Sequence, residues 1–338
     1  MPKISQSKLD GKVLAFIRDR GLVPENSILY VALSGGPDSV CLFDILYDLK
    51  DKLKIEIRAC HFNHKVRGVD SEKDKDFVIQ LTKKYGVLLE VGERDSKNAI
   101  KNELDARNLR YAYFEKILKS GGGDLLALGH NANDTAETML MRIIRGSGLK
   151  GLSSILPRRK KFIRPLLPFS RDEILEYLKS KNIKYRTDKT NLLPLYTRNQ
   201  IRLEIIPELK KYNPNIIETL AREASSLATD YGFICSEAQK LKNKFSFEKG
   251  EYSIYREEFL RYHPSLQRES IRLILEELVV ANDVTEDQIN KCILLIAKGS
   301  GGKILVLPHS LRLTLKGGKI YVFTYTDLHD PKGSPRDR

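Results

Sequence analysis

Residues 28–49 read ILYVALSGGPDSVCLFDILYDL, and this stretch decides the fold. The apolar run 28–33 predicts a strand, the amphipathic run 40–49 predicts a helix, and two adjacent glycines lie in the loop between them. Because Gly35 and Gly36 have no Cβ atom, the backbone can approach an anion closely, and N–H groups at a helix N-terminus point toward it. We therefore predict a strand, loop and helix that bind phosphate through residues 34–39.

The loop differs from a Walker A loop because no lysine stands at its end. Kinase-type transfer of a γ-phosphoryl group is therefore disfavoured. The hydroxyls of Ser34 and Ser39 add hydrogen-bond donors, and Asp38 would repel phosphate unless a Mg²⁺ ion lay between them. The alternative is an ordinary turn with Asp38 as the helix N-cap, which leaves the paired glycines and serines unexplained.

Size and charge indicate a protein of more than one domain with a polyanionic partner. The 338 residues include 58 Lys and Arg against 44 Asp and Glu, which gives a net charge of +14. This length exceeds the usual size of one core, so two domains are expected. RNA, DNA and an anionic membrane all fit the excess of positive charge.

The sequence contains no apolar run long enough to cross a bilayer and no apolar core of a secretory signal at its start. A cytoplasmic protein without membrane contact is the simplest expectation. The four cysteines are Cys41, Cys60, Cys235 and Cys292, and no two of them form a Cys-x-x-Cys pair. We expect reduced, mostly buried thiols, and a zinc or iron–sulfur site is disfavoured.

Short apolar runs alternate with helical patterns through the first part of the chain. Strands are predicted at 28–33, 55–62, 87–91, 125–128 and 162–167. Helices are predicted at 40–49, 71–85 and 100–119, another begins near residue 133, and a further one runs from 170 to about 180. Capping boxes are expected at Ser71 with Asp74 and at Ser170 with Glu173. The alternation predicts an α/β fold with a parallel five-stranded sheet flanked by helices. Ligands of such sheets bind beyond the carboxyl ends of the strands.

Two polar clusters follow the second and third predicted strands. The loop 61–68 holds two histidines and two cations, and we expect it to face a nucleotide rather than a zinc ion. On the next helix, Glu103, Arg107 and Arg110 share one face. The two arginines suit phosphate oxygens, but a salt bridge from Glu103 to Arg107 would explain the same spacing.

The segment after the fourth predicted strand reads GHNANDTAETM at 129–139. Asp134 and Glu137 lie one helical turn apart near the positive end of the helix dipole. We expect both to stay ionised and to suit an ammonium group, and the alternative is that one of them caps the helix. The glycine-rich segment 145–151 predicts a flexible loop able to close over a substrate.

Two basic segments follow. The run Arg158-Arg159-Lys160-Lys161 fits an RNA contact and a solvated face equally well. Further on, Arg198, Asn199 and Arg202 share one face of a predicted helix, which suits a ligand but is also typical of an exposed surface.

Six motifs cover about the first two-thirds of the chain. They are Ser-Gly-Gly-Pro-Asp-Ser at 34–39, His-Phe-Asn-His-x-x-Arg at 61–67, Ala-Arg-x-x-Arg-Tyr at 106–111, Gly-His-x-x-Asn-Asp-x-x-Glu-Thr at 129–138, Arg-Gly-Ser-Gly at 145–148 and Arg-Asn-x-Ile-Arg at 198–202. Together they resemble the tRNA(Ile) lysidine synthetase family, whereas the first motif alone marks only the wider PP-loop ATP pyrophosphatase superfamily. One departure is Asn133, where many members have an aspartate, and it weakens any metal role carried over to that position.

The resemblance implies a Rossmann-like PP-loop fold and a two-step reaction at one site. The O2 atom of the wobble cytidine in the CAU anticodon of tRNA(Ile) attacks the α-phosphate of ATP, and pyrophosphate leaves. The amine of free lysine then displaces AMP at C2 to give lysidine. Mg²⁺ is the implied cofactor, since it and backbone N–H groups stabilise the charge of a leaving pyrophosphate.

The resemblance also implies a role for each matched position. ATP would be bound by Ala32, Ser34, Gly35, Gly36, Pro37, Asp38, Ser39, Phe62, Arg110, Gly129 and His130, and Mg²⁺ by Asp38. Lysine would be held by Asp134 and Glu137, tRNA by Arg145, Lys150 and Arg198, and the reacting phosphate or a substrate carboxylate by Arg202. The implied catalytic residues are Asp38, Asp134, Glu137 and Arg202.

We expect a catalytic domain at 1–213, a smaller, mostly helical tRNA-recognition domain at 214–323, and a polar tail at 324–338. Helices are predicted at 215–244, 264–280 and 285–298, and a terminal hairpin at 303–307 and 311–323. The additional C-terminal domain of longer family members is not expected. A homodimer is left open.

Two rival functions remain at this point. A tRNA thiolase shares the phosphate loop and the fold but generally needs paired cysteines, which this sequence lacks. A non-catalytic RNA-binding relative could keep the ATP fold, but the intact Asp38, Asp134, Glu137 and Arg202 argue against such a loss of activity.

Overall fold

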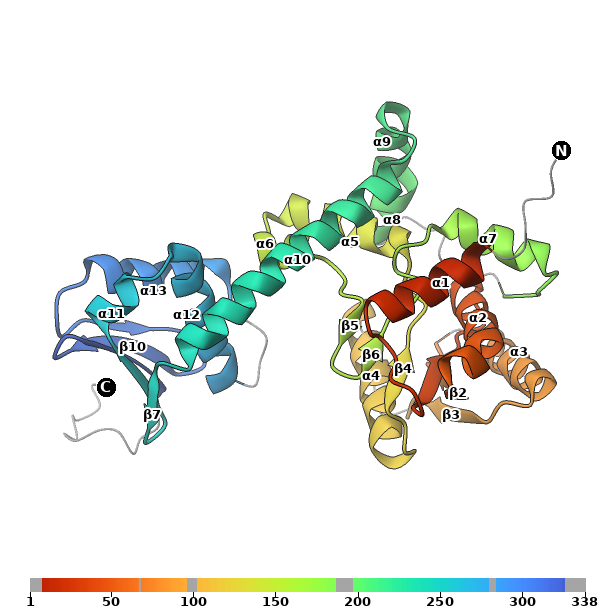
Figure 1. The fold of residues 1–338 in the computed structure, drawn as a ribbon, viewed down its shortest axis with the longest axis horizontal. Helices are drawn as coiled ribbons and strands as arrows, with labels where there is room; N and C mark the ends of the chain where they lie inside the picture. Colours follow the sequence, from red (N-terminus) through yellow and green to blue (C-terminus); the bar gives the residue numbers. More distant parts are fainter. Residues whose placement is uncertain (1–7, 67, 96–101, 187–196, 280–283, 326–338) are drawn as a thin grey trace. The chain divides into compact units, whose positions relative to one another are not determined.

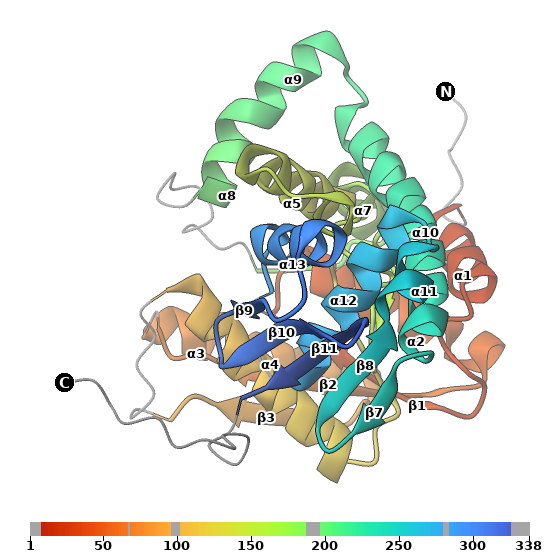
Figure 2. The ribbon, with the colours of Figure 1, turned by 90° about the vertical axis from the view of Figure 1, so that its left-hand side faces the viewer.

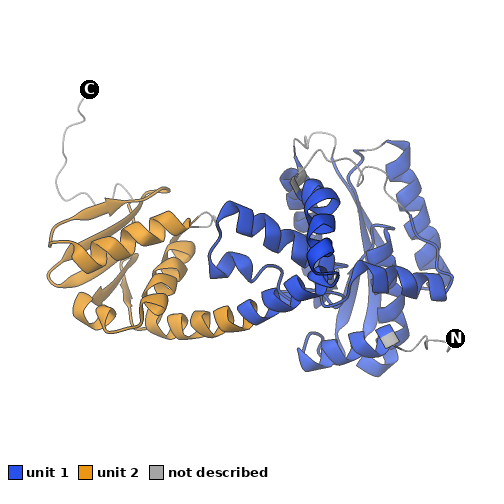
Figure 3. Ribbon diagram, turned by 90° about the horizontal axis from the view of Figure 1, so that it is seen from above, with its two compact units in different colours: residues 1–227 blue, residues 228–338 orange. Residues whose placement is uncertain are grey.

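The computed structural model describes residues 8–66, 68–95, 102–186, 197–279 and 284–325. The chain divides into two compact units, residues 1–227 and 228–338 (Figure 3). Helix α10 (Ile216–Lys242) runs across this division. The domain boundaries expected at 213 and 323 remain predictions, and the expected tail lies outside the described residues from 326 onward.

The first unit is built on a six-stranded sheet with the strand order β3-β2-β1-β4-β6-β5. Its strands are β1 (Ile28–Ala32), β2 (Glu56–Asn63), β3 (Leu89–Glu93), β4 (Leu125–Ala127), β5 (Arg158–Arg159) and β6 (Phe162–Ile163). Strands β3, β2, β1, β4 and β6 pair in parallel, and β5 pairs antiparallel with β6. The predicted parallel sheet of five strands is therefore confirmed, and β5 is a short addition at one edge.

Helices connect the strands and cover both faces of this sheet (Figure 1). The helical segments of this unit are α1 (Lys8–Asp19), α2 (Pro37–Leu53), α3 (Val69–Tyr85), α4 (Glu103–Ser120), α5 (Ala132–Arg145), α6 (Leu149–Leu152), α7 (Arg171–Ser180), α8 (Thr197–Gln200), the π-helical segment η2 (Ile201–Ile205) and α9 (Ile206–Tyr212), of which the last three follow the sheet in the chain.

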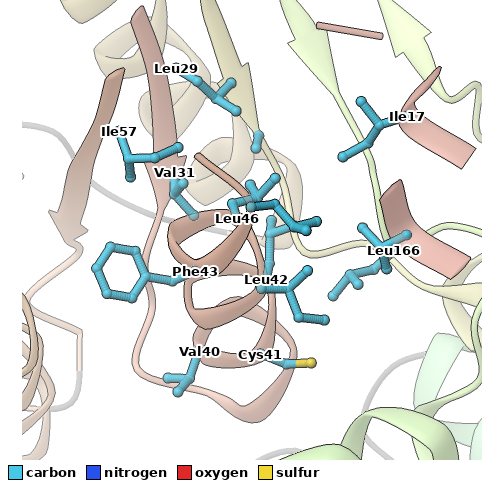
Figure 4. Close-up of a cluster of buried hydrophobic side chains, with 14 of the residues drawn as sticks. Ile17, Leu29, Val31, Val40, Cys41, Leu42, Phe43, Leu46, Ile57 and Leu166 are labelled. Atoms are coloured by element: carbon cyan, nitrogen blue, oxygen red, sulfur yellow. The ribbon is translucent and has the colours of Figure 1, made fainter. Parts of the chain in front are cut away.

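Alternate residues of β1 serve the two cores of this unit. Val31 packs with Phe43 of α2 in a buried cluster that also contains side chains of α1 and α7 (Figure 4). The preceding residue, Tyr30, points to the opposite face and packs with Phe114 of α4 and Leu126 of β4. A parallel sheet covered in this way on both faces needs apolar residues at successive positions, which explains the continuous apolar run that predicts β1.

The strand order brings two loops together. From β1 the chain passes to β2 and β3 on one side, and it then returns to β4 on the other side of β1. At such a reversal the connections leave the sheet in opposite directions, and a crevice forms at the carboxyl edge of the strands. The loops beside this crevice are residues 33–36 and 128–131.

The second unit contains a five-stranded antiparallel sheet with the order β7-β8-β11-β10-β9 (Figure 2). Its strands are β7 (Ser246–Glu248), β8 (Glu251–Tyr255), β9 (Ile304–Val306), β10 (Leu311–Lys316) and β11 (Lys319–Thr324), and its helices are α11 (Arg256–Leu260), α12 (Pro264–Leu278) and α13 (Glu286–Lys298). The helical patterns expected here are confirmed. The expected hairpin is part of a larger sheet, since β7 and β8 also belong to it. The sequence analysis did not predict these two strands.

The range 311–323, predicted as one strand, is in fact two strands. Gly317 and Gly318 have φ angles of +56° and +74° and form the tight turn between β10 and β11. Positive φ at both central residues is the geometry that suits the twist of a hairpin, and glycine adopts it without strain. The adjacent glycines were the signal for this turn.

Three local predictions have different outcomes. Helix α7 begins with the predicted capping box of Ser170 and Glu173. The capping box predicted at Ser71 is wrong, because α3 begins at Val69 with Gly68 as its N-cap and no side-chain cap. The loop predicted at 145–151 is shorter than expected, because Arg145 ends α5 and Leu149–Leu152 form α6, and its flexibility stays a prediction.

The cysteines are free thiols, and Cys41, Cys60 and Cys292 are buried, in agreement with the sequence analysis. Across the ranges that the structure describes, we find no helix of the length and apolar character needed to span a bilayer. Nor do the described residues include a group of three or more His, Cys, Asp or Glu side chains placed to hold a metal ion.

Candidate functional site

The loop after β1 is tied together by its serine hydroxyls. Ser39 Oγ donates a hydrogen bond to Gly36 O at 3.0 Å and lies 3.1 Å from Ser34 Oγ. The backbone N–H of Ser34 donates to Ser39 Oγ at 3.2 Å. The hydroxyls thus fix the shape of the loop. The donors best suited to an anion are the N–H groups of the first turn of α2, which have no partner within a helix.

Gly35 and Pro37 set the backbone path of this loop. Gly35 has a φ of +84°, which side chains rarely allow, and its carbonyl oxygen accepts a hydrogen bond from the N–H of Arg186 at 2.9 Å. Gly36 is the N-cap of α2 and Pro37 follows it in the first turn, where a missing N–H costs little. The alternative in which Asp38 caps the helix is therefore excluded.

The loop after β4 meets the first loop at Asp38. Asn131 Nδ2 donates to Asp38 Oδ1 at 3.0 Å. A Cβ atom on Gly129 would lie 3.0 Å from the carbonyl carbon of Asp38 and 3.1 Å from the backbone nitrogen of Ser39. Two segments that the sequence analysis singled out separately are thus in contact, and only glycine allows their backbones to come this close.

We expect Gly129→Ala to lower the free energy of unfolding by about 1 to 3 kcal/mol, because the new methyl group would overlap the backbone of Asp38. Gly11→Ala is the matched control. Position 11 has open space around its Cβ and lies within α1, so alanine should stabilise the protein by about 0.5 to 1 kcal/mol. Urea unfolding of both variants measures the contrast, and equal stabilities would show that the two loops can separate at little cost.

Asp134 takes part in the cap of α5. Asn131 Oδ1 accepts from the N–H of Asp134 at 3.2 Å, and Asp134 Oδ2 accepts from the N–H of Asn131 at 3.0 Å. This is a complete capping box, so the capping alternative is confirmed for Asp134. The same Asn131 side chain bonds Asp38, and it therefore links the cap of α5 to the start of α2.

Glu137 forms a buried, two-pronged ion pair with Arg202. The side chain of Glu137 is 1% exposed, and its oxygens accept from Arg202 Nε at 2.6 Å and from Arg202 Nη2 at 3.0 Å. Arg198 Nε lies 3.7 Å from the same carboxylate. Burial raises the pKa of Glu137, whereas the hydrogen bond from Arg202 lowers it. Burial also raises the pKa of Asp134. In both residues burial therefore opposes the ionised carboxylate that the sequence analysis expects.

Arg202 lies in η2, a π-helical segment between α8 and α9. Such segments are rare and are often found at functional sites. The predicted continuous helix is therefore interrupted at this point. Arg198 and Arg202 nevertheless reach the same carboxylate, as their placement on one predicted face requires.

Asp38 has the surroundings of a Mg²⁺ ligand. Its pKa is raised to about 6, because burial and the charge of Asp134 together outweigh the lowering by Arg171 and Arg202. Mg²⁺ in nucleotide sites is commonly held by one or two carboxylates together with substrate phosphates and water. Asp38 with the neighbouring Asp134 fits this donor set, so these residues could hold a Mg²⁺ ion that arrives with a nucleotide.

His130 is a neutral imidazole among arginines. Burial and the charges of Arg164, Arg107, Arg110 and Arg198 lower its pKa to about 3. Its Nδ1 has no hydrogen-bond partner among the described residues. Such a group can donate a hydrogen bond to an anion without changing its own charge near neutral pH.

We expect His130→Gln to weaken the pH dependence of stability. Because the folded state lowers the pKa of His130 to about 3, the imidazole takes up its proton mainly on unfolding once the pH falls below about 6.5. The wild-type protein therefore loses stability through His130 as the pH falls from 7 to 5, by about 2 kcal/mol. Urea unfolding at both pH values, with the exposed His309→Gln as the control, measures this. Equal pH dependence in wild type and His130→Gln would contradict it.

A family model described as a PP-loop domain matches residues 5–209. The chain is 38% identical over 313 residues to the tRNA(Ile)-lysidine synthase of Clostridioides difficile (strain 630), with 89% of this chain and 67% of that protein covered. The chain belongs to the tRNA(Ile)-lysidine synthase family. The family resemblance of the six motifs is confirmed, as is the PP-loop fold.

A second family member gives the same result. The tRNA(Ile)-lysidine synthase of Clostridium tetani (strain Massachusetts / E88) is 34% identical over 335 residues, which cover 96% of this chain and 71% of that protein. The chain thus spans about two thirds of the length of these relatives.

Among solved structures, the U34-tRNA thiolase NcsA from Methanococcus maripaludis with its 4Fe–4S cluster aligns with a TM-score of 0.55. The alignment covers 65% of this chain and 77% of that chain at 22% identity. At this identity the likeness concerns the fold alone.

Other residues that the family resemblance implies for ATP binding also lie at the carboxyl edge of the sheet. Ala32 and Phe62 stand at the ends of the neighbouring strands β1 and β2. The Phe62 ring packs 5.2 Å from the ring of Tyr113, centroid to centroid. Arg107 donates to Tyr111 Oη at 3.2 Å, and the side chain of Glu103, its alternative partner in the helix, lies outside the described part of the chain.

Two positions implied for the family are not gathered at this edge. Arg145 is the last residue of α5, the helix that Asn131 caps, so it lies roughly 20 Å along the axis from that cap. Lys150 follows in α6, and both side chains are exposed. The turn between them is held by Arg142, which donates to the carbonyl oxygens of Gly151 and Ser154.

Sequence reasoning missed three residues of the site. Asn131 could have been found, because Asn-x-x-Asp before an apolar helix is a capping signal. Arg171 acts on Asp38 through its charge, and its N–H donates to Asn133 Oδ1 at 2.9 Å. Arg164 is 5% exposed and donates to Leu156 O at 2.8 Å. Neither arginine has a local signal in the sequence. Asn133, the residue that departs from the family pattern, thus accepts a hydrogen bond from the first residue of α7.

Arg67, which ends the motif at 61–67, lies outside the described residues, as do residues 187–196. Each residue of the basic run 158–161 is exposed, at the turn between β5 and β6.

Proposed function

We propose that this chain joins free L-lysine to C2 of the wobble cytidine in the CAU anticodon of tRNA(Ile). ATP is consumed to AMP and pyrophosphate through an adenylated tRNA, and the product is lysidine. The observation that carries the proposal is the meeting of the phosphate loop and the Gly129–Glu137 segment at Asp38, in a chain of this family. We place this reaction in the cytoplasm.

The first step uses the edge formed by the two loops. The loop 34–39 accepts the pyrophosphate part of ATP at the N-terminus of α2, and Ala32, Phe62, Arg110, Gly129 and His130 surround its AMP part. Asp38 holds Mg²⁺, which when bound would neutralise charge on the leaving pyrophosphate. The neutral His130 can donate to a phosphate oxygen, since its pKa is lowered to about 3.

The second step needs a site for the lysine ammonium group. Glu137 and Asp134 supply the negative charge. Both oxygens of Glu137 already accept from Arg202, but each carboxylate oxygen has two lone pairs, so an ammonium group can share the carboxylate. The attacking amine must be neutral, and a neighbouring carboxylate can accept its proton. When no lysine is bound, Arg202 orients the Glu137 carboxylate through its two hydrogen bonds and balances its negative charge.

The tRNA is proposed to contact Arg145, Lys150 and Arg198. Arg145 and Lys150 are exposed cations on the exit from α5, which suits phosphate contacts. Arg198 Nη2 donates to Thr138 Oγ1 at 3.3 Å, so its guanidinium is fixed beside the carboxylate of Glu137. Contacts of this type make tRNA binding strongly dependent on salt.

Incubation of the protein with ATP, Mg²⁺, radiolabelled lysine and unmodified tRNA(Ile) tests the proposal, with elongator tRNA(Met) as control. We expect label in tRNA(Ile) alone, with matching release of AMP. Release of AMP without label would point to another nucleophile, as in a thiolase. Binding of RNA with neither AMP nor label would favour a non-catalytic relative.

A further inference from the structure

Arg186 contacts the phosphate loop, residues 34–39, through both its backbone and its side chain. Its N–H donates a hydrogen bond to Gly35 O at 2.9 Å. A Cβ atom on Gly35 would lie 3.5 Å from Cγ of Arg186 and 3.8 Å from its Cβ, so the stem of the side chain packs directly over this glycine. None of the six motifs contains Arg186, and the proposed reaction assigns it no part.

The guanidinium of Arg186 is anchored on α3. Its Nε donates to Asp74 Oδ1 at 2.9 Å, and the side chains of Arg186 and Asp74 are 38% and 13% exposed. An ion pair that is partly withdrawn from water is screened less than a fully exposed one. Phe77 of the same helix also packs on Gly35, since its Cδ1 would be 3.4 Å from a Cβ atom there. The phosphate loop, α3 and the chain after α7 therefore meet at Gly35.

The hydrogen bond to Gly35 O sets the direction of the next N–H group. A peptide group is planar and trans, so the C=O of Gly35 and the N–H of Gly36 point in opposite directions. Because Gly35 O faces Arg186, the N–H of Gly36 faces the other side, where it lies 3.4 Å from Ser34 Oγ. This distance exceeds the usual range of about 2.7 to 3.2 Å, so the N–H can donate to a stronger acceptor, such as a phosphate oxygen. Glycine adopts many backbone conformations, and an outside contact is therefore needed to keep this orientation.

We propose that Arg186 and Asp74 are positioning residues of the phosphate loop. Their ion pair holds the backbone of Arg186 against Gly35 and so keeps the N–H of Gly36 turned toward a bound pyrophosphate group. Both residues act through the backbone of the loop, and neither is assigned a contact with the ligand. A donor that is oriented in advance spares the ligand the cost of ordering the loop. This role rests on the proposed function, which assigns the pyrophosphate part of ATP to the loop.

The test measures binding of inorganic pyrophosphate, ATP and AMP to the full chain by calorimetry, with Mg²⁺ and without tRNA or lysine. Arg186→Ala and Asp74→Ala should each weaken pyrophosphate and ATP binding about tenfold, because the ligand must then order the loop. The affinity for AMP should change by less than about twofold, since AMP lacks the pyrophosphate group. The double variant should bind pyrophosphate no more weakly than either single variant, as is expected of residues that act as a pair.

Arg186→Lys keeps the charge and a long stem, and its pyrophosphate affinity should stay within about threefold of the wild-type value. The matched control is Lys12→Ala, which removes an ion pair of similar length, 2.8 Å to Glu173, from helices of the same unit. All three of its affinities should stay within about twofold of the wild-type values. Urea unfolding confirms that every variant is folded.

Three results would overturn the positioning role. The first is an Arg186→Ala protein that binds pyrophosphate like the control. The second is an equal loss of AMP and pyrophosphate affinity in Arg186→Ala, which would mark a general loosening of the unit. The third is a wild-type protein that does not bind pyrophosphate.

Failure here can be told apart from failure of the proposed reaction. If the wild-type protein transfers lysine to tRNA(Ile) and Arg186→Ala and Asp74→Ala bind pyrophosphate normally, only the positioning role is wrong. If those variants selectively lose pyrophosphate affinity and the wild-type protein transfers no lysine to tRNA(Ile), the positioning role stands and the proposed reaction is wrong.

Discussion

Arg202→Ala is expected to lower the free energy of unfolding by about 3 to 5 kcal/mol and to abolish transfer of lysine to tRNA. Glu137 is 1% exposed and both its oxygens accept from Arg202, at 2.6 and 3.0 Å. Removal of the guanidinium leaves this buried carboxylate to Arg198, whose Nε is 3.7 Å away. The loss of one partner from a buried ion pair typically has an effect of this size. Urea unfolding measures the first effect, and incorporation of labelled lysine measures the second.

The double variant Arg202→Ala with Glu137→Ala separates structure from chemistry. It should be more stable than the sum of the single effects predicts, because no buried charge is left unpaired. If the ion pair only stabilised the fold, the double variant should regain the lysine transfer that Arg202→Ala lacks. We expect it to remain inactive, since the site for the lysine ammonium is gone. Full lysine incorporation by Glu137→Ala would exclude the role assigned to that residue.

Arg202→Lys provides the conservative comparison. A lysine keeps the positive charge but presents one ammonium group in place of the fork that meets both oxygens of Glu137. We expect stability between that of the wild-type protein and that of Arg202→Ala. A stability equal to that of the wild-type protein would show that the charge alone matters and the two-pronged geometry does not.

The sequence predicts the parts of this site that depend on local patterns. Residues 28–39 predict a strand, a glycine turn and the start of a helix, because hydrophobic periodicity and the backbone freedom of glycine act within a few residues. The alternation of strands and helices then predicts a parallel sheet, and the carboxyl edge follows from that topology. The positions of residues 34–39 and 129–137 at one edge could therefore be expected before any coordinates were known.

The contacts that join these segments have no such signal. Asn131 and Asp38 are 93 residues apart, and Arg202 and Glu137 are 65 apart, so no period or spacing relates them. Membership of a family indicates which residue types matter but gives no bond between them. That Glu137 is already paired emerges only from the packing of η2, whereas the cap that Asp134 forms on α5 is local and matches the Asn-x-x-Asp pattern.

The second unit shows the same limit. Strands β7 and β8 are three and five residues long, which is too short for a clear alternation. The sequence therefore predicts a hairpin where a five-stranded sheet exists. The pairing of Lys319 with Lys316 and with Tyr255 could not be anticipated, because it depends on the register of strands that the sequence does not reveal.

Asp38→Asn is expected to slow AMP formation strongly and to stabilise the protein at the same time. Burial raises the pKa of Asp38 to about 6 from its ordinary 3.8, so the folded protein without metal bears the cost of an ionised carboxylate at pH 7. Asparagine removes that charge and can still accept from Asn131 Nδ2. The expected gain in the free energy of unfolding, measured in EDTA, is up to about 3 kcal/mol at pH 7.

The sign of this effect follows from the direction of the shift. Between its ordinary pKa of 3.8 and its folded pKa of about 6, this carboxyl group is ionised mainly in the unfolded state. The advantage of Asp38→Asn should therefore be absent below about pH 3, grow as the pH rises from about 4 to about 6, and stay constant above that. The rate of AMP release should fall by about 10² to 10³, because the ligand for the metal beside the leaving pyrophosphate is gone. Asp51→Asn, an exposed position of the same helix, should change neither quantity. A stable Asp38→Asn protein with normal AMP release would show that Asp38 is not a metal ligand, and a destabilised one would show that the hydrogen bond to Asn131 outweighs the buried charge.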